Sequence, residues 1–171
     1  MAPGAHGANR TGRMFTGDKS GEFLYPALYR AGFANQAEGR TPNDGLILVD
    51  TYMTNVVHCA PPGNKPSTQE LDNCRSYLVT EIEILPDLQV ILALGKLAFD
   101  SILIALRECS RTAKTQPPNS RPYFVHGAQY TIEPYTLLAC YHPSQRNTNT
   151  GLLTIPMIDT VLQLVRRQLT E

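Results

Sequence analysis

Apolar residues recur three or four positions apart in four segments of the chain, a spacing that predicts four helices. The segments are residues 22–34, 71–85, 97–106 and 155–165. The second segment carries further signals at its ends, because Ser67 to Glu70 fit a capping box and Pro86 is a helix stop.

Short apolar or β-branched runs between these segments predict strands at residues 46–49, 51–57, 89–94 and 136–140. Gly95 ends the third run and a helical pattern follows it, which indicates a βα unit. The proline-rich stretch 110–122 is interpreted as a loop. Strands that alternate with helices predict an α/β domain with a largely parallel sheet, which binds ligands at the carboxyl ends of its strands.

The 171 residues are enough for one domain, so a single domain over 1–171 is expected. The longest apolar run, 90–94, is too short to cross a bilayer, and no secretory signal opens the sequence, so a cytoplasmic protein without a membrane partner is expected. The net charge is zero, which excludes a strong overall basic field, although basic residues do recur in the polar loops.

Three polar loops carry the candidate chemistry: loop one (residues 2–18), loop two (55–66) and loop three (141–151). In loop one, Phe15 is an aromatic among polar residues that is either a ligand contact or core, and Asp18 is either a functional carboxylate or a helix N-cap. In loop two, Asn55 would need a partner for its amide if it is buried in a strand, and Asn64 also fits a plain turn. In loop three, His142 directly follows a predicted strand.

Together the loops resemble uracil-DNA glycosylases, and most closely the thermophile-type family 5. The resemblance rests on APGAHG, ANRTGR and FTGD in loop one, VHCAPPGNKP in loop two and YHPSQRNTNTGLLT in loop three. It implies hydrolysis of the N-glycosidic bond of uracil in DNA, which leaves an abasic site, with the target base flipped out of the stack. It also implies a three-layer sandwich around a mostly parallel four-stranded sheet.

The resemblance assigns roles to individual residues. Phe15 would stack on the flipped uracil, Asp18 would serve the sugar side of the reaction, and His142 would donate to uracil O2. Asn64 matches a further site residue that positions water or substrate. The base pocket would also include Pro3, Gly4 and Ala5, where Ala5 replaces the water-activating carboxylate of other families.

Asn55 departs from family 5, which usually has a small or non-amide residue there, and instead matches the uracil-reading Asn of family 4. We expect it to narrow specificity toward uracil. The resemblance also implies that residues 144–150 of loop three wedge into the minor groove and hold the duplex open, with Arg146 near the opened gap. Phosphate contacts are expected from Asn9, Arg10, Lys65 and Ser144.

Cys59 and Cys74 match two of the four ligands of the 4Fe-4S cluster of families 4 and 5. Those families supply the other two ligands upstream of loop one, where this sequence has nothing, and the first strand would be missing too because Met1 already lies inside the loop. Cys109 and Cys140 are expected to be buried thiols.

Two explanations remain for the missing upstream ligands and first strand: a start assigned at an internal Met, or a real shortened product. The resemblance implies a monomeric enzyme whose partner is uracil-containing DNA, and no membrane partner is expected. The alternative is a non-catalytic DNA-binding remnant of a glycosylase.

Overall fold

The computed structural model describes residues 2–4, 7–109 and 122–170. The expected loop at 110–122 therefore lies outside the described residues, apart from its last position. The elements, in order, are α1 Ala8–Thr11, α2 Lys19–Arg30, the 3-10 turn η1 Pro62–Asn64, α3 Thr68–Ile84, β1 Val90–Leu94, α4 Lys96–Glu108, β2 Gln129–Ile132, β3 Tyr135–Cys140, α5 Gln145–Asn149 and α6 Ile155–Gln168.

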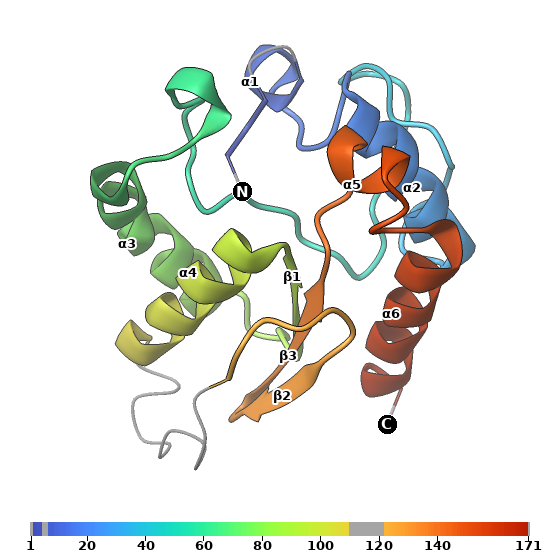
Figure 1. Ribbon diagram of the computed structural model, residues 1–171. Helices are drawn as coiled ribbons and strands as arrows, with labels where there is room; N and C mark the ends of the chain where they lie inside the picture. Colours follow the sequence, from blue (N-terminus) through green and yellow to red (C-terminus); the bar gives the residue numbers. More distant parts are fainter. Residues whose placement is uncertain (1, 5–6, 110–121, 171) are drawn as a thin grey trace.

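The sheet of the described residues has three strands in the order β1-β3-β2 (Figure 1). β1 and β3 are parallel, with Val90 opposite Thr136 and Leu94 opposite Cys140. β2 pairs with β3 in the antiparallel direction. The α/β class is confirmed, but the described residues do not form a four-stranded, mostly parallel sheet.

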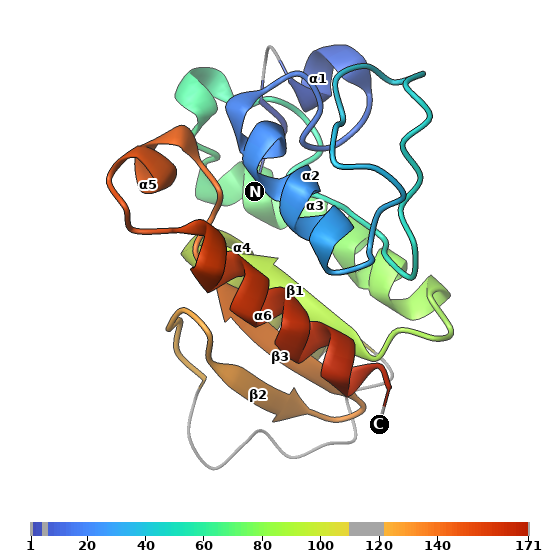
Figure 2. The ribbon, with the colours of Figure 1, turned by 90° about the vertical axis from the view of Figure 1, so that its right-hand side faces the viewer.

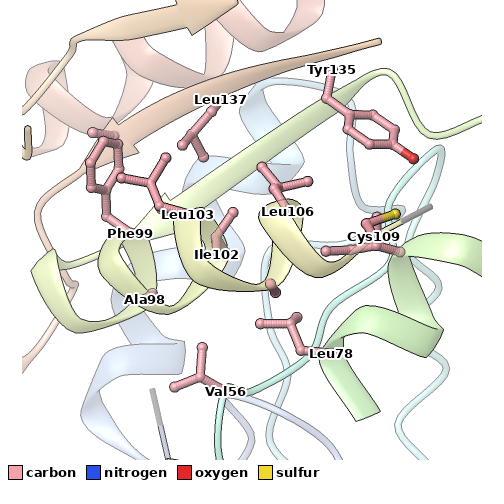
Figure 3. Close-up of a cluster of buried hydrophobic side chains, with 14 of the residues drawn as sticks. Val56, Leu78, Ala98, Phe99, Ile102, Leu103, Leu106, Cys109, Tyr135 and Leu137 are labelled. Atoms are coloured by element: carbon pink, nitrogen blue, oxygen red, sulfur yellow. The ribbon is translucent and has the colours of Figure 1, made fainter. Parts of the chain in front are cut away.

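Helices cover both faces of this sheet, as expected for strands that are apolar on both sides. α3 and α4 pack on one face, and α2 and α6 pack on the other (Figures 1 and 2). The α4 face buries Phe99, Ile102 and Leu106 between Leu137 of the sheet and Val56 of loop two (Figure 3). Loop two is thus fastened to the core at its first half.

The four predicted helices all form, and the clearest local signal is at α3. Ser67 accepts a hydrogen bond from the Glu70 amide, while the Glu70 carboxylate accepts from the Ser67 amide, which completes the capping box. None of the helices in the described part of the chain is long and apolar enough to span a bilayer.

The prediction of strands at 46–49 and 51–57 is wrong. The only ladder contact in this region of the described chain is an isolated bridge between Ala34 and Leu48. β-branched residues favour an extended backbone, but a strand also needs a neighbour with free backbone groups, and residues 51–57 have none. β2 was not predicted.

The three polar loops meet at one end of the molecule. α1 of loop one, η1 of loop two and α5 of loop three all lie beyond the end of the sheet where β1 and β3 terminate (Figure 1). Only loop three directly follows a strand of the described chain, so the shared location of the other two depends on tertiary packing. This end of the molecule holds the candidate site.

Candidate active site

Asp18 takes the N-cap role, one of the two that the sequence left open, and keeps one carboxylate oxygen free of that role. It is the N-cap of α2, and its Oδ1 accepts a hydrogen bond of 2.9 Å from the Gly21 amide. Its Oδ2 faces the glycine turn of loop one, where a Cβ on Gly7 would overlap that oxygen. One carboxylate oxygen is therefore used by the helix, while the other is directed at the loop.

Phe15 has a left-handed backbone, with φ of 53°. Its carbonyl oxygen lies so close to Gly21 that a Cβ on that glycine would overlap it, so the Phe15 backbone packs directly against the start of α2. The Phe15 ring faces the His142 ring of loop three, with centroids 5.9 Å apart and planes tilted by 32°. The structure thus brings two predicted site residues together.

His142 is largely buried at the end of β3, and this burial lowers its pKa to about 4. The imidazole is therefore neutral at pH 7. Its Nδ1 is buried without a hydrogen-bond partner among the described residues. Because buried polar atoms are usually paired, this orphan nitrogen points to a ligand or a water at the site.

A network of side chains fixes the remainder of loop one. The Arg13 guanidinium donates two hydrogen bonds, of 2.9 and 2.8 Å, to the two Asp44 oxygens. Arg13 Nε donates to Oγ1 of Thr16, which is 0% exposed, and the Tyr25 hydroxyl donates to the Met14 carbonyl at 2.6 Å. The Arg13 guanidinium also holds the pKa of Asp44 well below its usual value.

Sequence reasoning missed this network. In the sequence Arg13 is one of several basic loop residues, and its partner lies 31 positions away in a segment with no pattern of its own. The only available signal was the unusual density of turn-forming residues around Asp44.

Asn55 is buried, at 6% exposure, but it lies in irregular chain and not in the expected strand. Its amide nitrogen donates to the Met14 sulfur at 2.7 Å. The need of a buried amide for a partner, which was predicted, is thus met by a loop-one side chain.

The second half of loop two is exposed. Asn64 has a left-handed backbone, with φ of 56°, and is bonded through its amide to the Pro61 carbonyl. Within the described residues, neither its side chain nor that of Lys65 forms a hydrogen bond or ion pair.

The other predicted contacts line the same end of the molecule. Asn9 and Arg10 are exposed on α1, Arg146 is exposed on α5, and Ser144 is the N-cap of α5. The Gly4 carbonyl accepts from the amides of Gly7 and Asn9, and Pro3 is buried. Ala5 lies outside the described residues.

The two candidate cluster ligands are free thiols, Cys59 exposed and Cys74 half-buried. The His58 and Tyr77 rings lie 5.2 Å apart, and Tyr77 follows Cys74 by one turn of α3. This contact brings the Cys59 segment to the face of α3 that carries Cys74. The described residues contain no group of three or more potential metal ligands. Cys109 and Cys140 are fully buried, as predicted.

Comparison with known proteins adds the following matches. Residues 1–166 match the profile described as the uracil DNA glycosylase superfamily. A type-5 uracil-DNA glycosylase of Thermus thermophilus is 44% identical over 170 residues, which are 98% of this chain and 72% of that protein. A type-5 enzyme of Mycobacterium bovis is 42% identical over 169 residues, 98% of this chain and 60% of that protein. A type-4 enzyme of Pyrobaculum aerophilum is 34% identical over 144 residues, 84% of this chain and 63% of that protein.

Proposed function

The chain belongs to the uracil-DNA glycosylase superfamily, and we propose that it hydrolyses the N-glycosidic bond of uracil in DNA and leaves an abasic site. The observation that carries this proposal is the facing pair of Phe15 and His142, with Asp18 three residues after Phe15 in the same loop. The likeness to type-5 enzymes supports the same activity.

Phe15 provides the surface on which a flipped base stacks. Stacking on an aromatic ring contributes roughly 1–3 kcal/mol per base and requires no sequence reading. The fixed left-handed backbone of Phe15 supports this role, because a ring whose backbone is already ordered loses little freedom when the base arrives.

Bond cleavage moves the electron pair of the C–N bond to uracil and leaves positive charge on the sugar. A neutral His142 donates a hydrogen bond to uracil O2, where negative charge accumulates. The Asp18 carboxylate stabilises the sugar cation or orients the water that adds to its anomeric carbon, and Asn64 assists in placing that water. Water supplies the hydroxyl to the sugar and the proton to uracil.

Asn55 is proposed to select uracil through its amide. Its burial supports this role, because an amide that loses its partner in a buried site penalises bases that cannot replace it. On base binding, the Asn55 amide must then give up its hydrogen bond to the Met14 sulfur and bond the edge of uracil. Pro3, Gly4 and Ala5 complete the base pocket in this proposal.

Polar groups at this end of the molecule, most of them exposed, are proposed to hold the DNA. Lys65, Arg10 and Arg146 provide positive charge, and Asn9 and Ser144 provide hydrogen bonds to phosphates. These contacts fix position without reading sequence. The enzyme is proposed to act as a cytoplasmic monomer.

Cys59 and Cys74 are proposed as two ligands of a 4Fe-4S cluster. The fit is supported by two thiols that lie on adjoining segments and form no disulfide in the described part of the chain. The remaining two thiolates would come from outside the described residues. The cluster would hold loop two to α3 and takes no part in bond cleavage.

The test is excision from a duplex with one G·U pair, followed by alkaline cleavage of the abasic site. The wild-type chain should cut the uracil strand and leave a G·C control intact. His142→Ala should lower the rate by orders of magnitude with DNA affinity nearly unchanged. DNA binding without any cleavage by the wild type would instead support the non-catalytic remnant.

A further inference from the structure

The peptide units at the end of β3 are held from several sides. The Gly95 amide donates to the Cys140 carbonyl at 2.7 Å. The His142 carbonyl accepts from the Ser144 amide and from Asn147 Nδ2, both at 2.8 Å. Between these anchors, the amide of Tyr141 donates to a side chain, Nδ1 of His126, at 3.1 Å.

His126 reaches Tyr141 from a turn that is itself attached to β3. The Ala128 amide donates to the Val125 carbonyl at 3.0 Å, and Gly127 adopts φ of 79° between them. The Gly127 amide donates to the Ala139 carbonyl at 2.7 Å. The His126 ring then stacks on the Tyr141 ring, with centroids 4.8 Å apart and planes within 10°.

We propose that His126 is a positioning residue for excision, because its Nδ1 and its stacked ring fix the Tyr141 peptide that places His142. This inference rests on the proposed function, in which His142 must meet uracil O2. A misplacement of about 1 Å at a catalytic group costs on the order of 100-fold in rate. The bond also fixes the His126 tautomer, since an accepting Nδ1 leaves the ring proton on Nε2.

Several variants separate the bond from the stacking. His126→Phe keeps an aromatic ring against Tyr141 but has no acceptor, whereas His126→Asn places an acceptor oxygen near the position of Nδ1. Val125→Thr changes an exposed residue of the same turn and is the matched control. We expect His126→Phe to lower the single-turnover excision rate about tenfold with DNA affinity unchanged. His126→Asn should recover most of the rate, and the control should match the wild type.

A double variant tests whether His126 acts through His142. If it does, adding His126→Phe to His142→Ala should lower the excision rate no further. An equal fractional loss in both backgrounds would overturn the proposal, as would a wild-type rate in His126→Phe.

Gly127→Ala gives a second route if His126→Phe does not fold. There is open space where its Cβ would lie, so only the positive φ is penalised and the turn that carries His126 shifts. Gly127→Ala should also slow excision, and an unchanged excision rate in this variant would contradict the proposal. A folded His126→Asn that cuts no faster than His126→Phe or Gly127→Ala would contradict it as well. Absence of excision by the wild type would instead reject the proposed function itself.

Discussion

Loop one and the second half of loop two border the same site but are held in opposite ways. Loop one is fixed by the Arg13–Asp44 ion pair, by the hydrogen bond that Arg13 Nε donates to Thr16, and by the hydrogen bond that the Tyr25 hydroxyl donates to the Met14 carbonyl. Residues 62–65 of loop two are exposed, and their side chains form no hydrogen bond or ion pair in the described chain. Phe15 and Asp18, whose proposed roles need fixed geometry, lie in the anchored loop, whereas Lys65, a proposed phosphate contact, lies in the free segment.

The sharpest test of the anchored side separates the two roles of Asp18. Asp18→Asn keeps an N-cap of equal quality but removes the charge, so we expect thermal unfolding to change little. The excision rate should fall about 100-fold or more in single-turnover assays. A wild-type excision rate would mean that Asp18 is only a helix cap. Loop one would then be anchored without holding a catalytic carboxylate.

Loop three is also anchored, and its buried His142 should make the free energy of unfolding fall at acid pH. Its pKa of about 4 in the fold lies below the usual 6.5, so the unfolded chain binds its proton more readily as pH falls through that window. Urea unfolding at pH 7 and pH 4 should show a loss of about 2–3 kcal/mol from this group. His142→Ala should lose correspondingly less, and an equal loss in both proteins would mean that His142 is solvated.

Breaking the anchor should convert loop one into a second free loop. Arg13→Gln removes the bidentate ion pair, so we expect excision to fall about tenfold because Phe15 and Asp18 lose their fixed placement. Lys19→Gln is the matched control, since its ion pair with Glu22 is fully on the surface. Single-turnover rates decide between them, and equal rates would show that the network is dispensable.

The smallest effect is expected on the free side. Lys65→Ala should weaken DNA binding only a few-fold and reduce the slope of log affinity against log salt by about 1, with no change in unfolding. Arg107→Ala, an equal charge change near the C-terminal end of α4, should leave the salt slope as it is. If Lys65→Ala lowers the unfolding temperature, loop two is part of the scaffold after all.

Local signals predicted the helices but not the pairings. The capping box at Ser67 and the apolar run of β1 act within a few residues, so the sequence displays them directly. The extended residues 51–57 were misinterpreted because strand formation depends on a partner elsewhere in the chain. Antiparallel β2 was missed because four residues provide too little alternation.

The same distinction applies to the candidate site. Phe15, Asp18 and His142 could be named from their motifs, and the facing rings of Phe15 and His142 agree with that choice. Arg13 with Asp44, and His126 with Tyr141, are pairs separated by 31 and 15 positions. Only the folded chain brings such pairs together, which is why neither pair was predicted.

The four cysteines divide into two accessible and two buried thiols, which should react with an alkylating reagent at different stages. Cys59 and Cys74 can meet an alkylating reagent in the native state, whereas Cys109 and Cys140 are sealed in the core, and burial raises the pKa of Cys140 to about 12. Mass spectrometry of the alkylated protein should therefore count two early adducts and two that appear only when the whole fold opens. Slower alkylation of Cys59 and Cys74 would indicate iron bound at α3. The alkylation rate of Cys109 and Cys140 would report global unfolding in the same sample, without a mutation.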